Sequence, residues 1–141
     1  MTATPNASFL RFLPAIGRWL LGLPLVVFGA MGLFHPMAPP PDLAPQAKAF
    51  SLALAQTGYM MPMIGVVLLV GGFLLVINRF VPVALLLLAP FFVNSVLFHV
   101  VLEHTGIAPA AVFSALLLSL AWAYRGVFAG VLQAKNVPGP R

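Results

Sequence analysis

The feature that most constrains this chain is a run of 44 residues, from Tyr59 to Leu102, that contains one formal charge, Arg79. A helix needs about 20 apolar residues to cross the hydrocarbon core of a bilayer. The run is therefore long enough for two crossings, and the polar pair Asn78-Arg79 near its middle can form the turn between them. The sequence predicts an integral membrane protein.

The composition agrees with a membrane protein. Charged residues make up 6% of the 141 residues and hydrophobic residues 62%, whereas a soluble domain has about 25% charged residues. The chain has no cysteine, which excludes thiolate nucleophiles, iron–sulfur clusters and cysteine-bound metals from its chemistry. The net charge is +5, but the cations form no basic cluster, so no nucleic-acid partner is expected.

Four apolar segments predict four membrane-spanning helices, over residues 13–34, 59–77, 81–102 and 107–124. Each segment is long enough to cross the hydrocarbon core at about 1.5 Å per residue. The expected fold is an all-α membrane protein, a bundle of four transmembrane helices that forms one integral membrane domain over residues 1–141. A cleavable signal peptide is the alternative for the first segment, but its apolar run is long and no small-residue cleavage site follows directly.

The cations predict the orientation of this bundle. Only Lys48 falls on the outer side, and the other six Lys and Arg residues fall on the opposite side: Arg11, Arg18, Arg79, Arg125, Lys135 and Arg141. Because cytoplasmic loops are enriched in Lys and Arg, both termini are expected to be cytoplasmic. Trp19 and Trp122 stand beside arginines at the same predicted interface, where tryptophan is enriched.

The first outer connection, residues 35–58, is long and begins with a proline-rich run that cannot be helical. From Pro45 onward, Ala47, Phe50 and Leu54 fall on one helical face. This spacing predicts a short helix that lies on the outer membrane surface. A disordered loop is the alternative.

Small residues are expected to form helix contacts, because membrane helices associate through close backbone approach. Such residues recur in three of the segments: Gly22, Gly29 and Gly32; Gly65, Gly71 and Gly72; Ala111, Ala115, Ser119 and Ala123. The sequence leaves open whether these residues pack within one chain or between copies, so a homo-oligomer stays open.

Polar residues within the apolar segments are the candidate functional residues. Asn94 lies near the midpoint of the third segment, so we expect it to face the bundle, either in an interhelical hydrogen bond or as a ligand contact in a central cavity. His99 and Glu103 lie one helical turn apart near the outer end, where Glu103 can pair with the histidine. His35 ends the first segment on the same side, and we expect it to share an outer cavity with His99.

These residues, Asn94, His99, His35 and Glu103, form the candidate cofactor-binding set. Imidazoles and a carboxylate can bind zinc or copper, contact a quinone head group, or provide axial ligands for haem. Their spacing matches no specific metal motif, so no metal site is assigned. Polar packing at the interface is the alternative without a ligand.

The chain resembles the DoxX family of small bacterial membrane proteins. The resemblance rests on residues 78–90 followed by Asn94, Phe98-His99 and Gly106, on Gly71-Gly72, on residues 121–125, and on a set in the first segment: Arg18, Gly22, Phe28-Gly29, Gly32 and Phe34-His35. It covers about residues 18–128 and implies a four-helix bundle in the bacterial cytoplasmic (inner) membrane. Members of the broader group are associated with quinone-linked sulfur oxidation, with complexes that resist oxidative stress, and with maturation of redox enzymes.

The chain departs from this family at one place in the second segment. Family members often carry a lysine and a glutamate about three residues apart, where this chain has Gly65 and Leu68. If that pair belongs to a redox or proton-handling site, this chain lacks it, which makes catalysis by the chain alone less expected.

Three functions stay open on these residues. The favoured one is a non-catalytic accessory subunit of a membrane redox or oxidative-stress complex, with a redox enzyme as its partner and no catalytic residue of its own. The second is a quinone- or haem-associated electron-transfer component. The third is a small transporter, formed as an oligomer around Asn94. The sequence does not specify the cofactor.

Overall fold

The computed structural model describes residues 12–35 and 38–130, and over these residues the chain is all-helical, as predicted. Its helices are α2 (Leu13–Phe34), α3 (Pro45–Gln56), α4 (Met60–Val76), α5 (Val81–Val101), α6 (Ile107–Ala123) and α7 (Arg125–Phe128). Each of the four long helices begins and ends within one residue of a predicted apolar segment. The short helix expected from Pro45 is α3. Predictions for Arg11, Lys135 and Arg141 lie outside the described residues.

Two helices, α2 and α5, are long and apolar enough to cross a membrane. Helices α3 and α4 meet at a bend of 91° and add a third crossing if the pair forms one broken span. Helix α6 is apolar and has 17 residues. Within residues 12–35 and 38–130, length and composition therefore give two to three candidate spans, which is consistent with a membrane protein.

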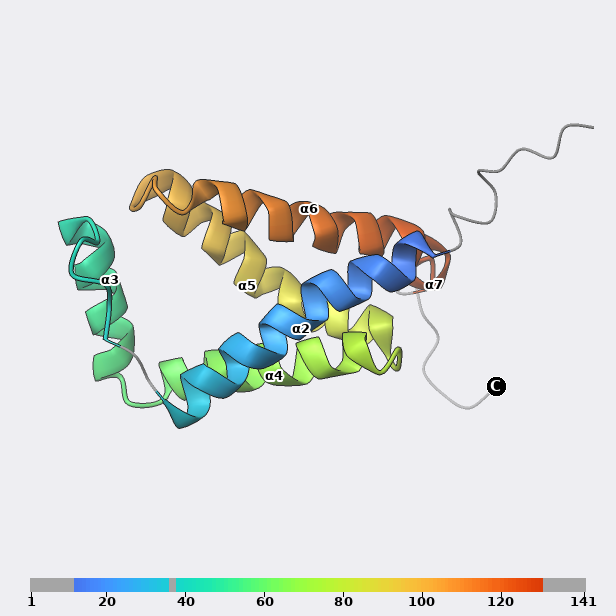
Figure 1. Ribbon diagram of the computed structural model, residues 1–141, viewed down its shortest axis with the longest axis horizontal. Helices are drawn as coiled ribbons and strands as arrows, with labels where there is room; N and C mark the ends of the chain where they lie inside the picture. Colours follow the sequence, from blue (N-terminus) through green and yellow to red (C-terminus); the bar gives the residue numbers. More distant parts are fainter. Residues whose placement is uncertain (1–11, 36–37, 131–141) are drawn as a thin grey trace, which may run out of the picture.

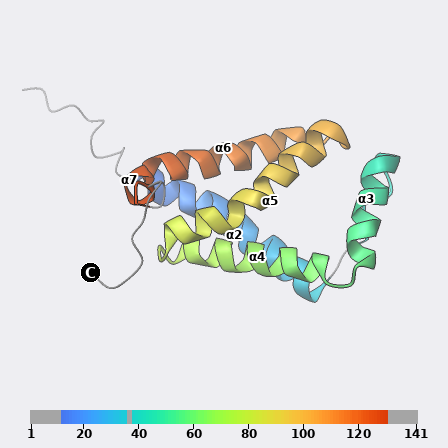
Figure 2. The same ribbon diagram turned by 180° about the vertical axis from the view of Figure 1, so that it is seen from behind.

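The four long helices form two antiparallel pairs, α2 with α4 and α5 with α6 (Figure 1). The pairs meet at the end where α2 begins, which we call the closed end. They separate toward the other end, which we call the open end, and α3 lies across the gap there. The view from behind shows the same arrangement (Figure 2).

Glycines allow α2 and α4 to pack backbone against backbone. A Cβ atom added to Gly29 would lie 2.8 Å from the Gly65 carbonyl oxygen, and one added to Gly72 would lie 2.8 Å from the Gly22 carbonyl oxygen. Real Cβ atoms do not approach backbone atoms this closely, so both positions exclude a side chain. The expected packing role of the glycines in these two helices is confirmed. The small-residue stripe of α6 is exposed instead: Ala111, Ala115, Ser119 and Ala123.

The core is concentrated where the two pairs meet, and Leu21, Leu75 and Leu88 are its largest fully buried side chains. At the closed end, the Arg18 guanidinium donates a hydrogen bond to the Tyr124 hydroxyl at 2.8 Å, which links α2 to the end of α6. The predicted turn between α4 and α5 is confirmed. Asn78 has a positive φ of 56° there, a conformation that asparagine adopts more readily than most residues.

Candidate functional site

An apolar cavity of about 240 Å³ lies between the two helix pairs on the α2 and α6 side. Most of its lining is aromatic or aliphatic, and its only polar side chains are Ser95 and His99 of α5. We call it the His99 cavity. It is lined by Leu25, Phe28, Leu68, Phe91, Phe92, Ser95, His99, Pro109, Ala110 and Phe113.

A hydrogen bond fixes the tautomer of His99. Its Nδ1 lies 3.0 Å from the backbone carbonyl oxygen of Glu103. A carbonyl oxygen can only accept, so Nδ1 carries the proton and, in the neutral ring, Nε2 is an acceptor. Neither Nε2 of His99 nor the hydroxyl of Ser95 has a hydrogen-bond partner within residues 12–35 and 38–130. Both residues line the His99 cavity.

The His99 ring occupies the space that the missing side chain of Gly106 leaves. A Cβ atom added to Gly106 would overlap the imidazole, with Nδ1 at 2.6 Å and Nε2 at 3.0 Å. The ring therefore packs directly on the backbone of the α5–α6 turn. A glycine is required here for the space that it leaves, since its φ of −90° is open to any residue.

Glu103 is buried, and its carboxylate is fully engaged by hydrogen bonds. It accepts from the Ala44 amide at 2.8 Å, from the Thr105 amide at 3.2 Å and from the Thr105 hydroxyl at 2.6 Å. These bonds, with the hydroxyl of Thr105 contributing most, lower the pKa of Glu103 from 4.5 to about 2. Hydrogen bonds of this kind stabilise the charged form.

The role of Glu103 is therefore to anchor the start of α3 to the α5–α6 turn. The expected pairing of its carboxylate with His99 is wrong, because the backbone carbonyl of Glu103 makes that contact. Sequence reasoning missed Thr105 and Ala44. Only the spacing of Glu103 and Thr105 could have indicated a turn, and nothing in the sequence links Glu103 to Ala44, 59 positions away.

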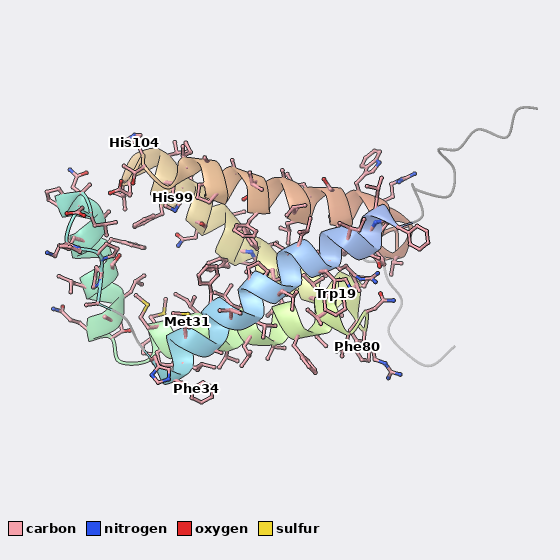
Figure 3. The ribbon with its side chains drawn as sticks, viewed as in Figure 1. Trp19, Met31, Phe34, Phe80, His99 and His104 are labelled. Atoms are coloured by element: carbon pink, nitrogen blue, oxygen red, sulfur yellow. The ribbon has the colours of Figure 1, made fainter. Side chains whose placement is uncertain are left out.

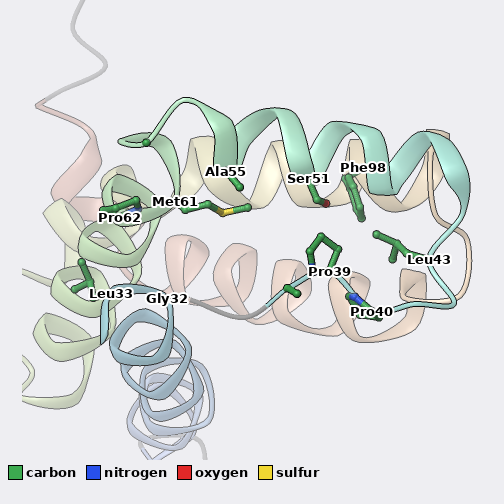
Figure 4. A pocket seen from close by; sticks show the side chains of 12 residues that line it. Gly32, Leu33, Pro39, Pro40, Leu43, Ser51, Ala55, Met61, Pro62 and Phe98 are labelled. Atoms are coloured by element: carbon green, nitrogen blue, oxygen red, sulfur yellow. The ribbon is translucent and has the colours of Figure 1, made fainter. Parts of the chain in front are cut away.

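A second cavity of about 520 Å³ lies beneath α3 (Figure 4). Pro39 and Leu43 of the outer loop, Ala55 of α3, Met61 of α4 and Phe98 of α5 contribute to its lining. The Phe98 ring lies 5.7 Å from the Phe50 ring of α3, centroid to centroid. Phe98 lines this second cavity, and the next residue of α5, His99, lines the His99 cavity.

His35 is exposed at the end of α2 and lines neither of these two cavities. In Figure 3, His99 lies beside α5 and α6, whereas Phe34, the residue before His35, lies at the opposite corner of the open end. Neither of these two cavities is therefore the expected cavity shared by His35 and His99. The physical reason is that α2 packs on α4 and diverges from α5 toward the open end.

Asn94 is also placed differently from the prediction. It is exposed, and it does not line a central cavity. The core face of α5 is formed by Leu85, Leu88 and Phe92. Asn94 follows Phe92 by two residues, or about 200° around the helix, so its side chain points away from the bundle.

Among residues 12–35 and 38–130, no group of three or more His, Asp or Glu side chains is placed to hold a metal ion. No known protein-family model, curated protein or solved structure matches this chain. The chemistry of the site must therefore be argued from its own residues.

Proposed function

We propose that this chain is a DoxX-like, non-catalytic membrane subunit of a redox system, and that the His99 cavity receives the ring of a quinone-class molecule from the bilayer. The observation that carries the proposal is the pair of polar residues, Ser95 and His99, that line an otherwise apolar, aromatic cavity. Among the described residues, Ser95 Oγ and His99 Nε2 have no hydrogen-bond partner. Binding sites for small molecules commonly combine apolar walls with a few polar groups that fix orientation.

The dimensions of the cavity favour a head group with a long apolar tail. At about 240 Å³, the cavity is smaller than the roughly 300–1,000 Å³ of sites that enclose a whole drug-sized ligand. Phe28 of α2 is 53% exposed, and Pro109 of α6 is also exposed. The cavity therefore opens between these two helices to the outer surface of the bundle. A ring can enter there while its isoprenoid tail stays in lipid.

The hydrogen-bonding groups fit both redox forms of such a ring. The Ser95 hydroxyl can donate to a quinone carbonyl, and the neutral His99 Nε2 can accept from a quinol hydroxyl. Glu103 has no role in this binding, because its carboxylate is occupied by the hydrogen bonds from Ala44 and Thr105. Haem bound between His35 and His99 is not favoured, because these residues do not line the same cavity.

The proposal includes four membrane crossings by α2, α4, α5 and α6, with both termini cytoplasmic and α3 on the outer surface. Helices α4 and α6 have 17 residues each, which gives about 25 Å at 1.5 Å per residue. The 91° bend between α3 and α4 is the angle expected where a spanning helix follows a surface helix. Trp122, stacked 4.8 Å from the Arg125 guanidinium, supports an interface at the closed end.

The resemblance supports placing this bundle in the bacterial cytoplasmic membrane with a redox enzyme as partner. A gentle-detergent pull-down through a tag at the C-terminus tests that part. A stoichiometric redox enzyme in the eluate supports the accessory role. Isolation of the chain alone, with no change in any redox enzyme when the gene is deleted, contradicts it.

A binding titration tests the cavity. The purified protein in mild detergent is titrated with a short-chain ubiquinone analogue, and the dissociation constant is compared between variants. His99→Leu should weaken binding by about tenfold, the factor that corresponds to one hydrogen bond of about 1.4 kcal/mol. His104→Leu is the matched control, because His104 is an exposed histidine of the same turn that does not line the cavity. Equal affinities for the two variants would contradict the proposal.

A further inference from the structure

The face of α5 that points away from the core carries the side-chain amide of Asn94, at a depth where lipid chains offer no hydrogen-bonding group. Asn94 lies three residues past the midpoint of the 21-residue helix, or about 4.5 Å by helical rise. It is exposed, and within the described part of the chain its amide makes no hydrogen bond. If α5 crosses a membrane, as its length and hydropathy allow, this amide lies in the hydrocarbon core. A primary amide placed there without a partner costs several kcal/mol.

A second polar group lies on the same side of α5. Pro90 is exposed and stands within the helix. Because proline has no backbone N–H, the Leu86 carbonyl loses its hydrogen bond within the helix. The face around Asn94 therefore presents an amide with donors and acceptors together with a carbonyl acceptor, and the rest of it is apolar: Val83, Leu87, Leu97 and Val101 are all exposed.

We propose that a second copy of this chain packs on this face, with the two Asn94 amides hydrogen-bonded across a twofold axis. A primary amide has both a donor and an acceptor, so it is complementary to itself, and a symmetric pair satisfies both copies with one residue type. A different protein would have to supply a matching polar group at the same depth, and lipid chains supply none. The Asn94 face is the surface of α5 opposite the core, so the His99 cavity stays open in this dimer.

The chain contains no cysteine, so single-cysteine variants report the interface directly. Asn94→Cys and Leu97→Cys should form disulfide-linked dimers in membranes under mild oxidation. Leu118→Cys on α6, at a site that is 67% exposed, and Val27→Cys on α2, at a site that is 55% exposed, are matched controls and should stay monomeric. Cross-linking at the control positions but not at Asn94 or Leu97 would overturn the proposal, and so would no cross-linking at any position.

A substitution series tests the amide itself. The dimer is measured by energy transfer between labelled copies in lipid vesicles. Asn94→Leu should weaken association by about three- to tenfold, the range measured for hydrogen bonds between membrane helices, and Asn94→Gln should restore much of the loss. A dimer unchanged by Asn94→Leu, or a monomer in the unsubstituted protein, would overturn the proposal. The association of copies is measured with α5 in the membrane and without any ligand. A negative result for the dimer would therefore not contradict the proposed quinone binding.

Discussion

Glu103 is one of two acidic residues in the chain, and its carboxylate holds the backbone of another element. The donors of Ala44 and Thr105 converge on it and fix the start of α3 against the α5–α6 turn. The same turn places the Glu103 carbonyl on His99 Nδ1. One residue therefore connects the outer loop to the orientation of the candidate binding histidine.

The anchor predicts a pH dependence for α3. The pKa of Glu103 in the folded chain is about 2, below the ordinary value of 4.5, so its ionised form contributes stability above about pH 4.5. That contribution is lost as the pH falls toward 2. Hydrogen exchange of the Ala44 amide, corrected for the intrinsic rate, should be slow at pH 6 and faster near pH 3.

A substitution separates this effect from general acid unfolding. Glu103→Gln should speed exchange of the Ala44 amide at pH 6 while α5 and α6 stay protected. His104→Gln should change this exchange far less, because His104 makes the smallest of the contributions that lower the Glu103 pKa. Protection of the Ala44 amide that is equal in Glu103→Gln and the unsubstituted chain would show that the carboxylate does not hold the loop.

Gly106 offers a second test at the residue scale. Gly106→Ala places a Cβ atom against the His99 ring, so the ring must turn and its hydrogen bond with the Glu103 carbonyl is lost. We expect quinone-analogue affinity to fall by about tenfold, as in His99→Leu, with little change in thermal stability. Gly126→Ala is the control, because a Cβ atom there meets nothing within 4 Å. Equal affinity in both glycine variants would contradict the assigned place of His99.

At the scale of elements, the α2–α4 contact is the tightest in the described residues. Gly29→Ala forces a methyl group against backbone atoms of α4 that cannot move aside, with the Gly65 oxygen at 2.8 Å. Overpacking of this kind costs about 1–3 kcal/mol. Gly32→Ala is the matched control, because its nearest neighbour would lie at an ordinary 3.7 Å. Thermal unfolding in detergent should show a lower midpoint for Gly29→Ala alone. Equal midpoints would show that the glycine contact does not stabilise the pair.

The bounds of the helices could be predicted from the sequence, because each apolar run ends at turn residues or at a polar pair such as Asn78-Arg79. The sequence could not predict which side chains of each helix face the core. Helix α5 is apolar on nearly all sides, so its sequence does not mark the core face, and polarity alone wrongly placed Asn94 inside. The position of His35 depends on α2 packing on α4 and diverging from α5, which no local pattern encodes.

At the scale of the whole molecule, the proposed topology places α3 and the α4–α5 turn on opposite sides of the membrane. Gln46→Cys at the start of α3 and Asn78→Cys in the turn are both exposed positions. In intact cells, a membrane-impermeant maleimide should label Gln46→Cys, and should label Asn78→Cys only after the cells are opened. Labelling of both variants in intact cells would contradict the four-crossing topology.

The central claim is that the His99 cavity binds a quinone-class ring, and photolabelling tests it most directly. The protein in its native membrane is irradiated with a quinone analogue that carries a photoreactive group on the ring, and the modified residues are identified by mass spectrometry. We expect labels on residues that line the cavity in α5 and α6, such as Phe92 and Phe113, and we expect excess unlabelled quinone to prevent this labelling. Labels confined to residues outside the cavity, or labelling that excess quinone does not reduce, would contradict it.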